Sequence, residues 1–197
     1  MKVIQVSSNV NEKEMTKALD LCYAVGADTI SINAPQVFNF RAYNYIVDNL
    51  PRLKKDNKDI RFTIINPEDS NIFALPIPSY RFSNIVEIIR KYLCYVGLDV
   101  SNMDSNVFES DFMRKIKDFL PYISVFYISD KNKAGKDHML PGDGILNLPL
   151  LLKKLKDLNY ARYISTKVTI SKADLADTDK VKFLMKKMRK YYEENYL

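Results

Sequence analysis

Short β-rich runs alternate with helical patterns along the whole sequence, and this alternation limits the fold more than any other feature. Val3–Val6 is expected to form a strand, Asn11 to cap a helix that ends near Gly26, and Thr29–Asn33 to form the next strand. Glu14 stands three residues after Asn11, which is the spacing of a capping box. Because a βα repeat requires parallel strands joined by helical crossovers, the sequence predicts an α/β fold on a parallel sheet.

The same alternation continues to the end of the sequence. Four further strands are expected at 61–66, 96–100, 123–129 and 163–170. Helices are expected at 42–53, from Asn84, at 108–119, from Asn147 and around 181–188. These segments give about six parallel strands, fewer than the eight that close a (β/α)8 barrel. The length of 197 residues fits a single domain, 1–197.

Composition excludes several classes of protein. Hydrophobic residues make up 47% of the chain and charged residues 27%, which excludes disordered and collagen-like sequences. No apolar run approaches the ~18 residues of a membrane span, so we expect a cytoplasmic protein with no membrane contact. Cys22 and Cys94 lack CxxC spacing and are expected to be buried free thiols. The net charge of +6 is dispersed and favours anionic partners only weakly.

Polar residues alternate with apolar ones in the last three expected strands. If helices cover the outer face of the sheet, Asp99, Tyr127 and Lys167 point to the other face. Parallel strands buried on both faces are usually almost wholly apolar. The polar lining therefore indicates a binding or catalytic site rather than a packed core.

Several segments, in order, resemble the xylose-isomerase-like TIM-barrel superfamily. They are Val-Gly-Leu-Asp at 96–99, the strand with its following residues at 125–130, the loop His-Met-Leu-Pro-Gly-Asp-Gly at 138–144, and 159–165 after a leucine-rich helix. The loop at 138–144 is the most specific of these. The superfamily contains sugar phosphate isomerases and epimerases and the endonuclease IV type of apurinic-site nuclease. The resemblance implies a TIM-barrel-like fold whose site lies at the carboxyl ends of the strands.

The number of strands modifies this expectation. The six βα units resemble the last six of the eight in the superfamily, so the resemblance implies an incomplete or open barrel that is shortened at its N-terminus. Six strands cannot close with the tilt and stagger of an eight-stranded barrel. An uncovered sheet edge invites association, and we therefore expect a homodimer.

The resemblance also implies a metal site, which this sequence does not reproduce. Similar epimerases hold one divalent ion with a glutamate, an aspartate, a histidine and a second glutamate, each at a strand end. The matching positions hold Asn66 (with Glu68 two residues on), Asp99, Tyr127 and Lys167, and Asn33 stands where an earlier strand typically has a histidine. Hard cations need several oxygen or nitrogen ligands and resist a neighbouring ammonium. We therefore expect no cofactor, and we predict that Lys167 takes the place of the ion and neutralises Asp99.

The candidate site residues follow from the strand ends and from the loop. The candidates for catalysis are Asp99, Lys167, Tyr127 and His138. The candidates for substrate binding are Asn33, Asn66, Glu68, Ser129, Asp130, Gly142 and Gly144. The backbone of the Pro-Gly-Asp-Gly turn at 141–144 precedes a helix and could hold a phosphate or a carboxylate, although a tight turn explains the glycines equally well.

The sequence leaves three functions open. The first is a sugar phosphate isomerase/epimerase-like protein with altered or lost catalysis, and the second is a non-catalytic relative that binds a small anion, a carbohydrate or a protein. The third, an apurinic-site endonuclease-like nucleic-acid binder, is disfavoured because the metal cluster that would activate water is missing. For Lys167, a structural ion pair with Asp99 and a Schiff-base nucleophile also stay open. His138 either serves catalysis or only braces its loop.

Overall fold

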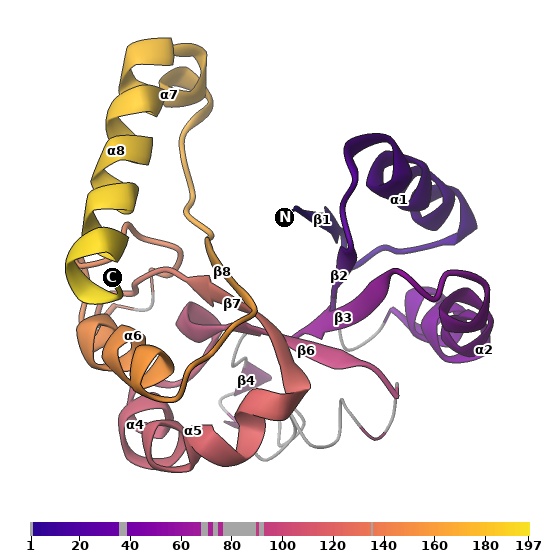
Figure 1. Ribbon diagram of the computed structural model, residues 1–197, viewed down its shortest axis with the longest axis horizontal. Coiled ribbons are helices and arrows are strands. Elements are labelled where there is room, and N and C mark those ends of the chain that lie inside the picture. The colour runs from indigo at the N-terminus through magenta and orange to yellow at the C-terminus, as the bar shows by residue number, and fades with distance from the viewer. Residues whose placement is uncertain are drawn as a thin grey trace. The chain divides into compact units, whose positions relative to one another are not determined.

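A computed structural model describes residues 2–35, 39–67, 71–72, 75–76, 90, 93–134 and 136–197. Its main sheet has six strands in the order β1-β2-β3-β6-β7-β8 (Figure 1). They are β1 (Val3–Val6), β2 (Thr29–Asn33), β3 (Arg61–Ile65), β6 (Tyr95–Asp99), β7 (Ile123–Ile128) and β8 (Tyr163–Thr166). β4 (Asn71–Ile72) and β5 (Leu75–Pro76) form a separate antiparallel pair. The expected α/β repeat of six strands is confirmed.

Helices lie between strands of the main sheet, and two more follow its last strand. They are α1 (Glu12–Val25), α2 (Phe40–Asp56), α4 (Ser105–Val107), α5 (Met113–Phe119), α6 (Leu148–Asp157), α7 (Lys172–Ala176) and α8 (Thr178–Asn195). The expected helix from Asn84 begins outside the described residues. The helix expected at 108–119 is interrupted, because Phe108–Phe112 forms a π-helical turn between α4 and α5.

Capping residues fix the ends of two helices as the sequence predicts. The Asn11 side chain accepts a hydrogen bond from the Glu14 backbone amide at the start of α1. Gly26 ends α1 with a φ of 64°, a left-handed conformation that glycine adopts without steric cost. Asn147 caps α6 by accepting from the Leu150 amide.

The helices and strands of the chain form two compact units. The first unit comprises residues 1–98 and 121–125. Its strands β1, β2, β3 and β6 pair in parallel, with Ile30 opposite Phe62 and Ile32 opposite Ile64. Its core includes Val6, Met15, Ala18, Cys22, Ile30, Ile32, Ile46, Leu50, Phe62 and Ile64. Both cysteines are free thiols; Cys22 is buried as expected, whereas Cys94 is only partly buried.

The second unit comprises residues 99–120 and 126–197. Aromatic rings form part of its core, with Phe112 5.9 Å from Phe108 and 6.3 Å from Phe126 between ring centroids. Tyr160 packs edge-on against Phe126 at 5.0 Å. The leucines that α6 buries are Leu148, Leu151, Leu152 and Leu155. The apolar spacing seen in the sequence thus corresponds to the buried face of α6.

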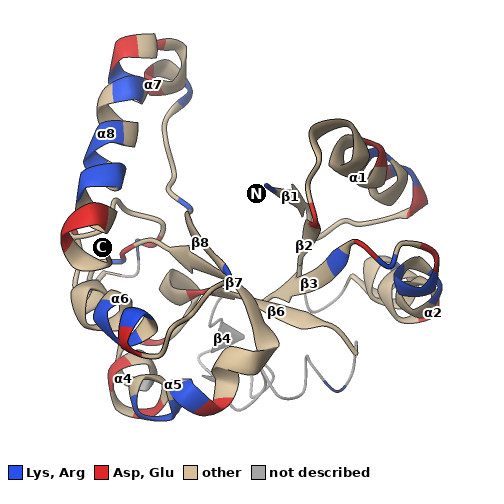
Figure 2. Ribbon diagram, in the orientation of Figure 1, with Lys and Arg blue, Asp and Glu red and all other residues tan. Residues whose placement is uncertain are grey.

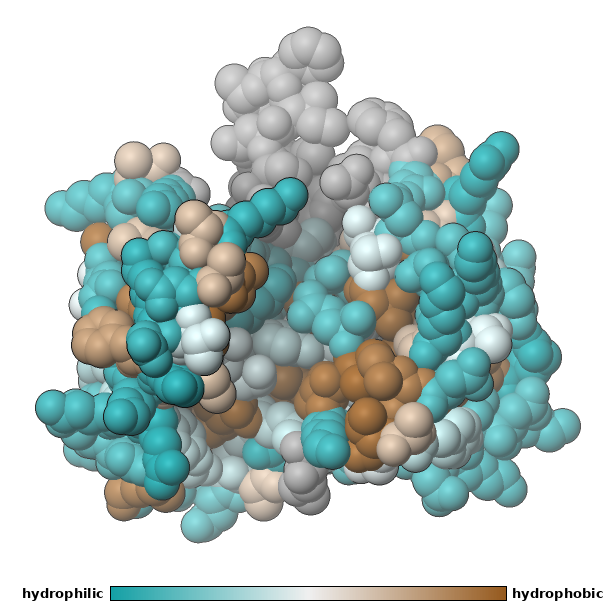
Figure 3. Space-filling model, turned by 90° about the horizontal axis from the view of Figure 1, so that it is seen from above, coloured by the Kyte–Doolittle hydropathy of each residue, from teal (hydrophilic) through white to brown (hydrophobic). Residues whose placement is uncertain are grey.

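The last segments differ from the sequence-based expectation. β8 ends at Thr166 rather than at residue 170. On α8, Val181, Leu184 and Met188 are partly buried, but Met185 is 60% exposed, so the expected apolar stripe is incomplete. On the face seen in Figure 3, hydrophilic side chains predominate, with hydrophobic patches between them. No described helix is both long and apolar enough to cross a membrane.

The basic residues of α8 are mostly paired with carboxylates. Figure 2 shows the run of blue segments along this helix. Lys187 contacts Asp143 at 2.9 Å, and Arg189 contacts Glu193 at 2.7 Å. Further pairs join Lys180 to Asp174, Lys182 to Asp179 and Lys190 to Glu194. These exposed pairs lower the local positive charge and contribute little to stability.

Candidate functional site

The carboxylate of Asp99, at the end of β6, is surrounded by hydrogen-bond donors and is fully buried. Its Oδ1 atom accepts from the Ser101 amide at 3.2 Å and from the Ser101 hydroxyl at 2.8 Å. Its Oδ2 atom lies 2.7 Å from Lys167 Nζ and 2.9 Å from His138 Nε2. Both carboxylate oxygens are thus engaged by the chain itself, which is how a buried charge is tolerated.

Lys167 reaches Asp99 from the residue that directly follows β8. Its backbone amide donates to the Ile128 carbonyl at 3.4 Å, which keeps it beside the end of β7. Its side chain is 26% exposed, and the ammonium lies 6.0 Å from the Tyr127 ring centroid. The predicted pairing of Lys167 with Asp99 is present, although the strand ends earlier than expected. The Lys167 side chain is therefore only partly covered in the pair.

His138 is held between two carboxylates on the loop that follows β7. Its Nε2 atom faces Asp99, and its Nδ1 atom lies 3.2 Å from Asp137 Oδ2. The His138 carbonyl accepts from the Thr169 amide at 2.8 Å, and its own φ is 51°, a left-handed conformation. Since ionised carboxylates only accept hydrogen bonds, the doubly protonated imidazolium is the form that satisfies both contacts.

The two charges of the Asp99–His138 contact shift each other's pKa. Burial alone would raise the pKa of Asp99, but the His138 hydrogen bond and the Lys167 charge outweigh burial, so the pKa is lowered. The hydrogen bond with Asp99 raises the pKa of His138, against an opposing effect of burial. Asp99 is therefore ionised, and His138 keeps its second proton to a higher pH than usual.

The raised pKa of His138 predicts a specific pH dependence of stability. The protonated form contributes stability that is fully present below about pH 6.5, the ordinary histidine value, and lost as pH rises through the folded-state pKa. His138→Gln removes the only histidine of the chain, so the stability of the variant should not show this decrease with rising pH. We expect the difference in Tm between wild type and variant to shrink from pH 5.5 to 9. Parallel Tm profiles would contradict the assignment.

Asp130 fixes the loop that carries His138. Its carboxylate accepts from the backbone amides of Lys131, Gly142 and Leu146 at 2.9, 3.1 and 3.0 Å. Its backbone also pairs with Met139. A Cβ atom at Gly144 would lie 2.3 Å from Asp130 Oδ1, so this close approach requires glycine. The Gly142 amide expected to bind a substrate anion thus already donates to Asp130, and the roles of Asp130, Gly142 and Gly144 in substrate binding stay predictions.

Asn33 and Asn66 are predicted site residues of the first unit. Asn33 Oδ1 accepts from Gln5 Nε2 at 3.1 Å, and the Asn66 backbone amide donates to the Gly97 carbonyl. Ser129 is fully buried, and its hydroxyl has no hydrogen-bond partner among the described residues. Glu68 lies outside those residues. The structure therefore brings together Asp99, Lys167 and His138, with Tyr127 beside the ammonium.

Two contacts of the site, Ser101 and Asp137, were not among the predicted site residues. Ser101 follows Asp99 by two residues, and strand parity assigns it to the same polar face as Asp99, but it was not chosen as a candidate. Asp137 precedes His138 directly, and neighbouring residues rarely face each other in regular structure. Its contact depends on the loop conformation, which the sequence pattern does not predict.

The donor set does not fit the divalent ion that the resemblance implies. Asp99 Oδ2 already contacts an ammonium at 2.7 Å and an imidazole at 2.9 Å. Across the described ranges, no group of three or more His, Cys, Asp or Glu side chains is placed to hold a metal. A cation at Asp99 would have to displace Lys167 and bear its repulsion.

Comparison with known proteins agrees with the strand and loop pattern. The sequence model of the family described as "Xylose isomerase-like TIM barrel" matches residues 9–191. No curated protein matches the chain. Among solved structures, D-allulose 3-epimerase from Methylomonas sp. superposes with a TM-score of 0.62 at 13% identity, covering 95% of this chain and 73% of that one. A sugar phosphate isomerase/epimerase from Parabacteroides distasonis gives 0.59 at 16% identity, covering 96% and 69%.

A third solved structure, the IOLI protein with a binding zinc atom, gives a TM-score of 0.59 at 15% identity and covers 98% of this chain and 77% of that one. At these identities the likeness concerns the fold alone. The family match spans nearly the whole sequence, including the segments that carry Asp99, His138 and Lys167.

Proposed function

We propose that this chain, which belongs to the xylose isomerase-like TIM-barrel family, binds a sugar or sugar phosphate through Lys167, beside His138, without a divalent ion. The observation that carries the proposal is the Lys167 ammonium 2.7 Å from the buried Asp99 carboxylate. The ammonium occupies the position where the resemblance implies a metal ligand. The ammonium thereby supplies positive charge next to Asp99. An aspartate is the residue type that the resemblance implies at position 99.

The hydrogen-bond donors of the cluster, rather than a net charge, favour an oxygen-rich ligand. Lys167 and the protonated His138 carry one positive charge each and face the two carboxylates of Asp99 and Asp137, so the charges of the cluster balance. Lys167 Nζ has three N–H donors and uses one of them on Asp99, which leaves others for a carbonyl, hydroxyl or phosphate oxygen. Such a donor stabilises negative charge that develops on a ligand oxygen.

The same contacts argue that isomerase or epimerase chemistry is altered or lost. Those reactions need a base that removes a proton from carbon. Asp99 is a poor base, because its pKa is lowered and both of its oxygens already accept hydrogen bonds. His138 is the remaining group that could hold or move a proton, once its pKa is exceeded and Nε2 turns away from Asp99. Any proton transfer would then increase with pH.

The neighbouring structures support the ligand class. One describes D-allulose 3-epimerase from Methylomonas sp. in complex with D-allulose, at 12% identity. Another is described as a sugar phosphate isomerase/epimerase. This chain has the fold, but its side chains do not form a set of ligands that fits a divalent ion. We therefore propose a carbohydrate ligand for it and no metal ion.

Two finer proposals extend from the sequence. β1 and β8 end the strand order of the sheet; Thr166 of β8 is exposed and its other residues are partly buried. We propose that edge strands pair between two copies, which sedimentation analysis would reveal as a dimer.

We also propose a cytoplasmic location, in keeping with two free thiols.

Calorimetric titration of the EDTA-treated protein with D-fructose 6-phosphate and D-ribulose 5-phosphate tests the main proposal. We expect binding without metal, and a loss of about 10-fold or more in affinity for Lys167→Met, because a charge-assisted hydrogen bond is removed. Lys172→Met, which neutralises an exposed lysine five residues away, is the matched control and should bind normally. Binding that needs a divalent ion, or that survives Lys167→Met unchanged, would overturn the proposal.

A second measurement separates binding from catalysis. In D2O, transfer of a proton to and from carbon exchanges the C–H next to the ligand's carbonyl for deuterium, which NMR detects. Exchange that depends on His138 would support altered catalysis, whereas binding without exchange would support the non-catalytic alternative.

A further inference from the structure

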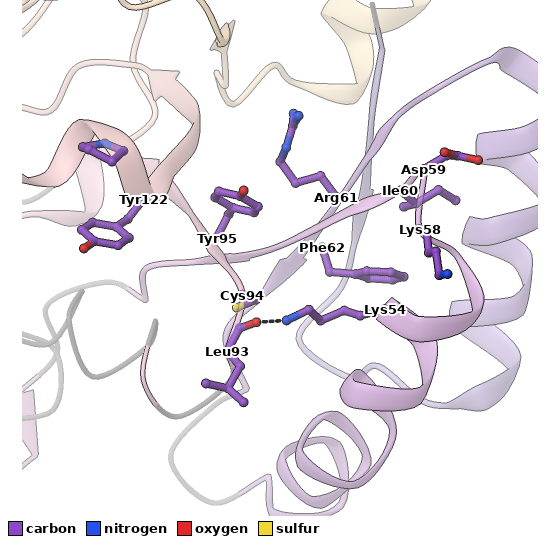
Figure 4. A pocket seen from close by; sticks show the side chains of 11 residues that line it. Lys54, Lys58, Asp59, Ile60, Arg61, Phe62, Leu93, Cys94, Tyr95 and Tyr122 are labelled. Carbon is purple, nitrogen blue, oxygen red and sulfur yellow. Dashed lines mark hydrogen bonds between the residues drawn. The ribbon is translucent and has the colours of Figure 1, made fainter.

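A cavity of about 730 Å3 lies in the first unit, at the amino ends of β3 and β6 (Figure 4). Its lining residues include none of those at the candidate site. Eleven residues line it: Lys54, Lys58, Asp59, Ile60, Arg61, Phe62, Leu93, Cys94, Tyr95, Pro121 and Tyr122. A volume of this size is typical of small-molecule sites, which range over roughly 300–1,000 Å3.

Positive charge predominates in this cavity. Three of its side chains are cationic and one, Asp59, is anionic. The Lys54 ammonium donates to the Leu93 carbonyl, whereas Lys58 and Arg61 form no ion pair within the part of the chain that the structure describes. The Arg61 guanidinium is the better anchor of the two, because its planar fork matches the oxygens of a phosphate.

Aromatic faces border the same cationic group. The Arg61 guanidinium lies 5.6 Å from the centroid of the Tyr95 ring. Tyr95 is 37% exposed and Tyr122 is 48% exposed. Figure 4 shows both rings beside the cavity, with Phe62 among its lining side chains. Exposed aromatic rings of this kind stack on flat, unsaturated rings.

Cys94 contributes an apolar wall rather than a reactive group. Burial raises the pKa of its thiol to about 12, against a lowering effect of Lys54. The thiol is therefore protonated at neutral pH and is a poor nucleophile. The cavity thus has the character of a reversible binding site, with a cationic part and an aromatic part.

We infer that this cavity binds a mononucleotide, with its phosphate at Arg61 and its base against the rings of Tyr95 and Tyr122. A sugar phosphate would leave both aromatic faces unused, and a neutral aromatic molecule would leave the Arg61 guanidinium unused. This inference is independent of the proposed function, since it concerns different residues.

Calorimetric titration of the full chain with AMP tests the inference. Arg61→Gln should weaken AMP binding by about 10-fold or more, because a charge-assisted contact is lost. Tyr122→Leu should weaken it by about 5-fold or more, the effect of losing one stacking ring. Lys13→Gln, an exposed charge change on α1, and Lys167→Met at the Asp99 cluster should leave the affinity within about 2-fold.

Adenosine and inorganic phosphate distinguish the two halves of the ligand, and both should bind more weakly than AMP. Circular dichroism checks that each variant is folded, and Tyr122→Leu changes an exposed ring that the core does not need. The inference is overturned if AMP does not bind or if phosphate binds as tightly as AMP. It is also overturned if Tyr122→Leu leaves AMP binding unchanged, or if either control variant, Lys13→Gln or Lys167→Met, weakens AMP binding as much as Arg61→Gln.

Discussion

Replacing Asp99 with asparagine is expected to lower the free energy of unfolding by about 3 kcal/mol. The change is nearly isosteric, but it removes the negative charge that Lys167 and His138 share at 2.7 and 2.9 Å. Breaking a buried ion pair by removing one partner leaves the other charge uncompensated, at a cost of about 3–5 kcal/mol. The lower end applies here, because Lys167 is partly exposed and can turn toward water. Urea denaturation followed by circular dichroism measures the loss.

A surface carboxylate provides the matched control for this variant. Asp111 pairs with Arg114 at 2.9 Å, but both side chains are exposed. Asp111→Asn should therefore change the free energy of unfolding by less than about 1 kcal/mol. Adding Lys167→Met to Asp99→Asn should recover part of the loss, because the uncompensated ammonium is then gone. Equal effects of Asp99→Asn and Asp111→Asn would show that the Asp99 contacts do not stabilise the fold.

Replacing Gly144 with alanine is expected to cost about 3 kcal/mol of folding stability. The new Cβ would lie 2.3 Å from both Asp130 Oδ1 and the Lys131 carbonyl oxygen. One of these atoms belongs to the backbone, so the clash cannot be relieved by a side-chain rotation alone. Moving Asp130 away would also disturb its bonds to the Gly142 and Leu146 amides. Because the same loop carries His138, the pH dependence of Tm should weaken together with stability.

Gly26→Ala is the control for Gly144→Ala, because it introduces backbone strain without a steric clash. Gly26 has a φ of 64°, and nothing lies within 4 Å of the position that an alanine methyl group would take there. Alanine there should cost only about 1 kcal/mol, the strain of a left-handed conformation. Thermal denaturation of both variants under the same conditions makes the comparison. If Gly144→Ala is no worse than Gly26→Ala, the loop does not close tightly around Asp130.

The secondary structure was predictable where its physical cause is local. The strands Val3–Val6 and Thr29–Asn33 and the caps Asn11 and Asn147 follow from residue periodicity and from side chains that bond nearby amides. The π-helical turn Phe108–Phe112 was not predictable, because its aromatic residues keep helical spacing in the sequence. Its ring contacts at 5.9 and 6.3 Å belong to tertiary packing.

The candidate site was predictable where strand parity determines direction. Parity and the resemblance together pointed Asp99 and Lys167 toward each other, and they lie in contact. The contact of His138 with Asp99 depends on a loop held by Asp130, and such a long-range arrangement leaves no periodic signal. The turn at 141–144 was interpreted as a candidate anion site, and in the structure the chain's own Asp130 carboxylate accepts one of its amides.

Calorimetric titration of Mn2+ into the wild type and into Lys167→Glu tests most directly whether the Lys167 ammonium occupies the place of a divalent ion at Asp99. We predict no stoichiometric Mn2+ binding by the wild type. Lys167→Glu should lose stability, because two carboxylates then face each other, and Mn2+ should restore part of this stability by binding them. Tight stoichiometric binding of Mn2+ by the wild type, with no gain in Lys167→Glu, would contradict the proposed replacement of the ion by the ammonium.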